Sequence, residues 1–76
     1  MSTHRPMTEK EKQLFEAFKL AIENERQAQG AYGRMAALAE DPRVRAVFEG
    51  FQREEAEHEE KLLQLYGEYK ARFIAE

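Results

Sequence analysis

The sequence predicts an all-α fold in which two long helices form an antiparallel hairpin, and three observations support it. Apolar residues recur at alternating steps of four and three in both halves of the 76-residue chain, which is the spacing of packed helices. Thr8 and Glu11 have the spacing of a capping box at the start of a helix. Between the halves, Asp41 can act as an N-cap and Pro42 suits the first helical position.

The element boundaries follow from these signals. We expect the first helix at about residues 9–40 and the second at about residues 42–73. Residues 1–7 lack periodicity and are expected to form a flexible arm. Because no linker of glycine and proline interrupts the rest of the chain, residues 8–76 are expected to form one domain.

Each predicted helix carries one apolar stripe, and the two stripes together are called the seam. In the first half the seam consists of Leu14, Phe18, Ala21, Glu25, Ala28, Tyr32, Met35 and Ala39. In the second half it consists of Val44, Phe48, Phe51, Glu55, His58, Leu62, Leu65 and Tyr69. A lone hairpin of this length cannot cover a seam this apolar on both sides. We therefore expect at least a homodimer, with two hairpins forming a four-helix bundle.

Glu25, Glu55 and His58 are the only ionisable residues in the middle of the seam. They lie at similar distances along the chain from the predicted turn, so the height of Glu25 in a hairpin differs from those of Glu55 and His58 by only about 3 and 1.5 Å. The three-residue step from Glu55 to His58 places both side chains on one helix face. We therefore predict that the three side chains converge in one layer.

A metal site is the interpretation that this layer favours, because buried carboxylates are unfavourable unless they are paired or bind a cation. Two hairpins related by a two-fold axis would supply four glutamates and two histidines, the ligand set of carboxylate-bridged di-metal bundles. Oxygen and nitrogen ligands suit iron or manganese. We expect iron, two ions per dimer, with Glu25, Glu55 and His58 as metal ligands and catalytic residues. The alternative is a metal-free polar layer in which His58 bonds a glutamate and fixes the helix register.

The Glu-x-x-His string is weak by itself, because residues 54–60 contain five glutamates. The register strengthens it, since the other four glutamates of this segment are expected off the centre of the seam or facing solvent. Tyr32 lies two turns after Glu25 and is expected either as a core aromatic residue or as a hydrogen-bond partner of a metal-binding carboxylate. Gly30 and Gly33 are expected on the face opposite the seam, either tolerated there or allowing another helix to approach in an assembly larger than a dimer.

Composition excludes several classes of function. The net charge is −3 and no basic stretch is interleaved with aromatic residues, so a nucleic-acid partner is not expected. No apolar run approaches the roughly 20 residues of a membrane span and the N-terminal segment has no hydrophobic signal region, so we expect a soluble, cytoplasmic protein without a membrane partner. The absence of cysteine excludes disulfides, iron–sulfur clusters and zinc–thiolate sites.

Two segments resemble known metal-binding helices. Residues 21–32 are similar to the first metal helix of rubrerythrins and related ferritin-like proteins, which have a glutamate followed by an alanine three residues later and a tyrosine seven residues later, here Glu25, Ala28 and Tyr32. Residues 41–58 resemble the second helix of encapsulated ferritins, which are half-length ferritins that build their site between two chains.

This resemblance implies a ferritin-like four-helix bundle with Glu25, Glu55 and His58 as iron ligands. The implied activity is that of a di-iron ferroxidase, which oxidises Fe(II) with O2 or peroxide for iron storage or detoxification. Encapsulated members of the family form rings of dimers and deliver iron to an encapsulin shell. The resemblance therefore implies two kinds of partner, further copies of this chain and an encapsulin shell. Two alternatives stay open: a rubrerythrin-like peroxide reductase with an external electron donor, and a non-catalytic helical assembly module.

Overall fold

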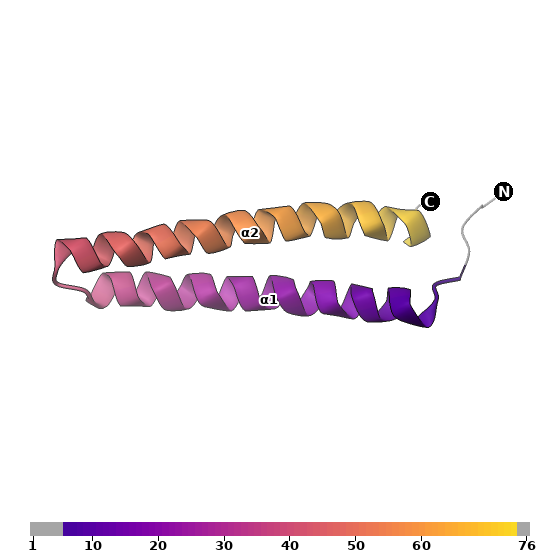
Figure 1. Cartoon of the computed structure of the whole chain (residues 1–76), viewed down its shortest axis with the longest axis horizontal. Coiled ribbons are helices and arrows are strands. Elements are labelled where there is room, and N and C mark those ends of the chain that lie inside the picture. Colours follow the sequence, from indigo (N-terminus) through magenta and orange to yellow (C-terminus); the bar gives the residue numbers. More distant parts are fainter. Residues whose placement is uncertain (1–5, 75–76) are drawn as a thin grey trace.

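The structure, a computed structural model that describes residues 6–74, consists of two α-helices joined by a short turn. α1 spans Glu9–Leu38 and α2 spans Pro42–Ile74. The helices run antiparallel, so the start of α1 and the end of α2 lie at the same end of a rod (Figure 1). No strand forms within residues 6–74. The predicted all-α hairpin is therefore confirmed for one chain.

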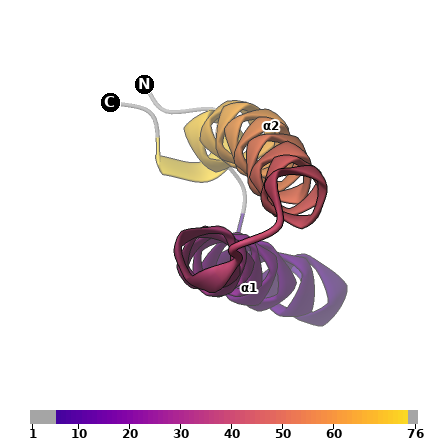
Figure 2. The ribbon, with the colours of Figure 1, turned by 90° about the vertical axis from the view of Figure 1, so that its left-hand side faces the viewer.

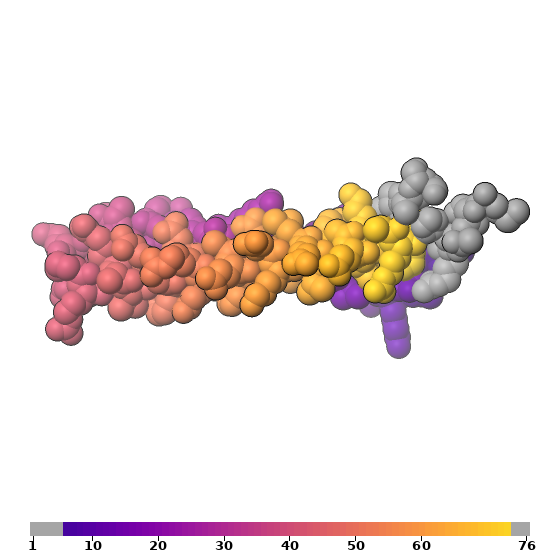
Figure 3. Space-filling view, turned by 90° about the horizontal axis from the view of Figure 1, so that it is seen from above, coloured from indigo at the N-terminus to yellow at the C-terminus, as the bar shows by residue number. Residues whose placement is uncertain are grey.

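The hairpin is long and thin. Its principal-axis extents are 60 × 19 × 13 Å, and Figure 3 shows this rod from the side of α2. Viewed along the rod from the turn, the two helices form a single layer (Figure 2). Over the described residues, neither helix combines the length and the apolar character that a bilayer span requires.

The start of α1 has the predicted capping box. The hydroxyl oxygen of Thr8 accepts a hydrogen bond from the Glu11 backbone N–H at 3.1 Å. In return, the Thr8 N–H donates to Oε1 of Glu11 at 2.8 Å. Because this pair satisfies two backbone donors that have no partner within the helix, it fixes the first residue of α1 at Glu9.

The turn is held by bonds from α2. α1 ends two residues earlier than predicted, because Ala39 adopts an extended conformation with ψ of 124°. Oδ1 of Asp41 accepts a bond from the Arg43 N–H at 2.8 Å, as expected of an N-cap. Nη2 of Arg45 donates to the Ala39 carbonyl oxygen at 2.9 Å and ties α2 to the end of α1. α2 then continues one residue beyond its predicted end.

The most buried positions differ from the predicted seam. Phe15, Ile22 and Ala36 are only 7%, 7% and 6% exposed, and none of them lies on the seam. They belong to a heptad stripe of α1, which faces a heptad stripe of α2. These inner stripes consist of Phe15, Ile22, Gln29 and Ala36 in α1, and of Gln52, Glu59, Tyr66 and Phe73 in α2. The seam was therefore only partly correct about the hairpin contact: Phe18 and Tyr32 do contact α2, but the most buried positions lie beside the seam.

A second pair of heptad stripes remains uncovered. These outer stripes consist of Leu14, Ala21, Ala28 and Met35 in α1, and of Val44, Phe51, His58 and Leu65 in α2. In each helix, the residues of the outer stripe come one position before those of the inner stripe. Because the helices are antiparallel, this shared offset turns the two outer stripes toward the same side of the hairpin. The large apolar side chains on it are 41% to 53% exposed. One side of the hairpin is thus a continuous apolar face.

The end of the hairpin away from the turn is closed by aromatic rings. The ring of Phe15 lies 4.9 Å from that of Tyr69 and 5.6 Å from that of Tyr66. Phe73 packs on Tyr69 with ring centroids 5.3 Å apart. The predicted arm of residues 1–7 falls largely outside the described residues, which begin at Pro6.

One glycine lies on a different side from the predicted one. Gly33 faces α2, and a Cβ atom there would lie 2.8 Å from Nε2 of Gln52. The nearest group to a Cβ atom at Gly30 is the Arg34 side chain of its own helix, at 3.4 Å. Gly33 therefore makes room for a side chain within the hairpin, and its predicted place on the opposite face was wrong.

Candidate metal centre

Glu25, Glu55 and His58 come together at the middle of the hairpin and are called the central cluster. Nδ1 of His58 lies 3.3 Å from Oε2 of Glu25 and 3.4 Å from Oε1 of Glu55. One possible ligand atom from each residue lies within 4.8 Å of the other two. The convergence predicted from the spacing along the chain is therefore present in the structure, with one carboxylate from α1 and a carboxylate and an imidazole from α2.

The carboxylates of the central cluster are poorly satisfied. Both glutamate side chains are 21% exposed, whereas His58 is 56% exposed. Oε2 of Glu25 is buried and has no hydrogen-bond partner. A carboxylate oxygen that has lost water without gaining a donor is unfavourable. A bound cation would satisfy it, because carboxylate oxygens are ligands for hard and borderline metal ions.

The neighbouring groups of the central cluster change the pKa of Glu55. Its pKa is raised above the ordinary value of 4.5, chiefly because its side chain hydrogen-bonds Glu25. Partial burial and the negative charge of Glu25 also raise this pKa, whereas His58 lowers it. A cation bound at this cluster would act in the opposite direction on Glu55, because a positive charge favours the ionised carboxylate.

The central cluster opens toward the uncovered side of the hairpin. His58 belongs to the outer stripe of α2 and lies seven residues from both Phe51 and Leu65. One chain therefore supplies three donor residues on a face that nothing within residues 6–74 covers. Three protein ligands can hold a metal ion whose other positions are taken by water or substrate. Any further protein ligands would come from outside this hairpin.

Tyr32 is part of the aromatic packing near the turn. Its ring lies 5.3 Å from that of Phe51 and is stacked on Phe48 at 6.3 Å. The structure shows no hydrogen bond from the Tyr32 hydroxyl to a carboxylate of residues 6–74. The structure therefore supports a packing role for the Tyr32 ring, and a hydrogen bond from its hydroxyl to a metal-binding carboxylate stays a prediction.

A neighbouring set of polar residues was missed by the sequence analysis and is called the polar clamp. Nε of Arg26 donates to Oε2 of Glu59 at 2.6 Å, and Nε2 of Gln29 donates to Oε1 of Glu59 at 2.6 Å. The Glu59 side chain is only 17% exposed. Its pKa is lowered, first by the hydrogen bond from Arg26 and then by that from Gln29.

The expected position of Glu59, off centre or facing solvent, was therefore only half correct. It lies off the central cluster, yet it faces α1, whereas Glu54, Glu57 and Glu60 are exposed. The signal was available, because Glu59 follows Glu55 by four residues and thus shares one face of α2 with it.

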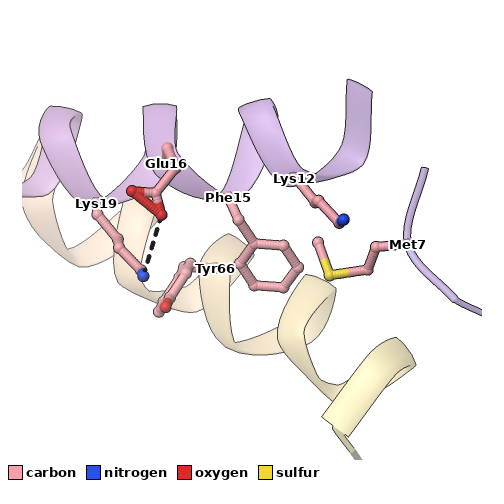
Figure 4. Close-up of a pocket in the computed structure, with 6 residues that line it drawn as sticks. All are labelled: Met7, Lys12, Phe15, Glu16, Lys19 and Tyr66. Carbon is pink, nitrogen blue, oxygen red and sulfur yellow. Dashed lines mark hydrogen bonds and ion pairs between the residues drawn. The ribbon is translucent and has the colours of Figure 1, made fainter. Parts of the chain in front are cut away.

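A separate hollow lies at the aromatic end, away from the central cluster. It has a volume of about 370 Å³ and is lined by Met7, Lys12, Phe15, Glu16, Lys19 and Tyr66. Figure 4 shows the Phe15 ring at its centre, with Met7 on one side and Tyr66 on the other. Nζ of Lys19 is paired with Glu16 at 3.3 Å. This hollow contains apolar surface and lysines but no histidine or paired carboxylates, so it offers no metal-binding set.

Comparison of the chain with protein-family models, with curated proteins and with solved structures finds no match in any of the three.

Proposed function

We propose that Glu25, Glu55 and His58 bind a divalent metal ion, and that two chains combine their clusters into a di-iron centre that oxidises Fe(II). The observation that carries this proposal is the buried Oε2 of Glu25, which makes no hydrogen bond and has Nδ1 of His58 at ion-pair distance, 3.3 Å away. A cation among these three side chains would neutralise the carboxylates and satisfy that oxygen.

The donor set supports iron or manganese more than other metals. Two carboxylates and one imidazole provide oxygen and nitrogen ligands, and the chain has no thiolate to favour zinc or copper(I). Carboxylates also favour the ferric over the ferrous ion, because the higher charge gains more from negative ligands. These residues would therefore lower the free energy of the oxidised product.

A second copy of the chain is the partner that supplies the further protein ligands. The outer stripes leave Leu14, Val44, Phe51 and Leu65 between 41% and 53% exposed around the central cluster. Val44 and Phe51 lie on the turn side of the cluster, whereas Leu14 and Leu65 lie on the other side. A two-fold axis through the cluster would place the turn side of one copy against the terminal side of the other, so that apolar residues meet apolar residues and the clusters face each other.

A hollow on this face fits that arrangement. It lies near the turn, has a volume of about 310 Å³ and is lined by Asp41, Arg43, Val44, Val47, Phe48 and Phe51. In the two-fold pair it would receive the apolar side chains at the terminal end of the second copy. The resulting four-helix bundle would contain four glutamates and two histidines at its centre, which is the ligand set of di-iron carboxylate bundles.

Fe(II) is the substrate in this reaction. Two ferrous ions lose one electron each, and one peroxide molecule takes both electrons and two protons to give two waters. The chain contributes position and a dry surrounding, since the outer stripes would exclude water from the centre of the bundle. Protons and the metal ion compete for Glu55, because the pKa of this carboxyl group is raised.

The metal part of the proposal is tested by anaerobic titration of chelator-treated protein with Fe(II). Sedimentation should show a shift toward the dimer, and analysis of the separated species should give two iron ions per dimer. Glu25→Gln should abolish both changes. Glu57→Gln is the control, because Glu57 is an exposed glutamate of α2 that directly precedes the ligand residue His58. Equal behaviour of these two variants, or no iron uptake by the unaltered chain, would refute the metal site.

The reaction is tested by adding peroxide or O2 to the iron-loaded protein. A ferroxidase accumulates Fe(III) in proportion to the Fe(II) supplied. A peroxide reductase instead consumes peroxide repeatedly and only while an electron donor is present. A chain that binds iron but shows neither result would be a metal-stabilised assembly module.

A further inference from the structure

The polar clamp lies directly beside the central cluster, and it joins the same two helices. Arg26 follows Glu25 in α1, and Glu59 follows His58 in α2. Both carboxylate oxygens of Glu59 accept short bonds from α1, at 2.6 Å from Arg26 and 2.6 Å from Gln29. Among residues 6–74 this is the polar contact that joins the middle of one helix to the other, apart from the contacts of the cluster itself.

The clamp occupies inward positions of the hairpin. Gln29 and Glu59 belong to the inner stripes, whose other members include the buried Phe15 and Ile22. Polar residues at such positions of packed helices fix the register of one helix against the other. They add little to stability, because Arg26 is 57% exposed and exposed ion pairs contribute weakly. The clamp therefore has the features of a register-setting contact.

The central cluster depends on register more than the apolar contacts do. A slide of one residue moves a side chain by about 1.5 Å, which would change the direction of the 3.3 Å contact between Glu25 and His58 and lengthen it. Apolar contacts depend less on direction, because the hydrophobic effect is non-directional. The turn fixes the register only at its own end, about 20 Å along α1 from Glu25.

We infer that Glu59, held by Arg26 and Gln29, is a positioning residue that sets the register of α1 against α2 at the central cluster, and through it the affinity and coordination geometry of the metal. This inference rests on the proposed metal function. Glu59 itself is not a ligand, because both of its oxygens are used by α1. It acts by holding Glu25 opposite Glu55 and His58.

The test is a titration of the chelator-treated full chain with Co(II), whose visible absorption reports coordination number and geometry. Glu59→Gln should weaken Co(II) binding at least about tenfold, as the loss of supporting contacts around metal sites does, and should change the absorption spectrum. Its melting temperature without metal should match that of Glu60→Gln. Glu60 is an exposed neighbour of Glu59, and its variant should bind Co(II) as the unaltered chain does.

Rescue provides a second readout. Arg26→Glu alone should weaken Co(II) binding, whereas Arg26→Glu combined with Glu59→Arg should restore much of the affinity and the original spectrum by reversing the ion pair. If Glu59→Gln does not fold, Gln29→Met removes one of the two donors and leaves the Arg26 contact in place. It should then give a smaller loss of affinity with the same direction of spectral change.

Each result bears on one of the two proposals. Binding by Glu59→Gln with unaltered affinity and spectrum would overturn the positioning role and leave the metal site intact. A loss of melting temperature and affinity with an unchanged spectrum and no rescue would show a merely structural role, and would also overturn it. Failure of the unaltered chain to bind Co(II) or Fe(II) would overturn the metal site, and the positioning role with it.

Discussion

Glu25→Gln tests whether the buried oxygen of the central cluster is there for a cation. In the metal-free chain this change removes a negative charge beside Glu55 and lets an amide N–H₂ group donate to that neighbour. An unsatisfied buried acceptor such as Oε2 of Glu25 destabilises a fold by about 1 to 3 kcal/mol. The side chain is 21% exposed, so we expect the variant to gain about 1 kcal/mol, at the low end of that range.

Bound metal should make the unaltered chain more stable than the Glu25→Gln variant. An ion that binds only the folded form adds about 2.7 kcal/mol to the free energy of unfolding at a hundred times its Kd. Glu25→Gln loses one of the three ligands that a chain supplies, so it should keep little of this gain. At that metal concentration the unaltered chain should therefore be more stable than the variant by roughly 1 to 2 kcal/mol.

The assay is urea unfolding followed by circular dichroism, with a chelator in one series and Mn(II) in the other. Protein concentration is kept fixed, because the stability of a dimer depends on it. Glu57→Gln should show the stability of the unaltered chain in both series, since its side chain is exposed. A Glu25→Gln chain that is less stable without metal, or that gains as much from Mn(II) as the unaltered chain, would refute the reasoning.

Three further predictions concern the surface, the pH dependence and the helix start. Phe51→Asp changes a residue of the outer stripe and should prevent dimer formation in sedimentation. Leu20→Asp should not, although the Leu20 side chain is more exposed, at 62% against 41% for Phe51. Dimers of both variants would contradict the proposed interface. Because the pKa of Glu55 is raised above 4.5 in the folded chain, the metal-free protein should lose stability as the pH rises from 4.5 through the raised value. Because Mn(II) and protons compete for the Glu55 carboxylate, Mn(II) affinity should rise over the same pH range, and calorimetry in two buffers should detect proton release. An affinity that does not depend on pH would count against the site. Thr8→Ala removes one half of the capping box and should lower the free energy of unfolding by about 1 kcal/mol in urea titrations, with no change in metal affinity.

The central cluster could be predicted from the sequence, whereas the polar clamp beside it could not. Glu25, Glu55 and His58 could be brought together from spacing alone, because the rise per residue is constant in a helix and the turn at Asp41 fixes which residues share a height. The polar clamp was not predicted. Which of five nearby glutamates meets α1 depends on the rotation of α2 about its own axis, and that rotation is set by contacts along the whole helix.

The sequence by itself determined the two helices, the turn and the capping box, because these depend on interactions between residues a few positions apart. Only the tertiary structure decided which side of each helix is buried. The predicted seam combined a side that faces the other helix with a side that faces nothing in this chain, since periodicity records that a position is apolar but not which neighbour covers it. The hairpin contact assigned Phe18 and Tyr32 to the first side, beside the buried Phe15 and Ile22 that the seam left out. It left Phe51 and His58 on the second side.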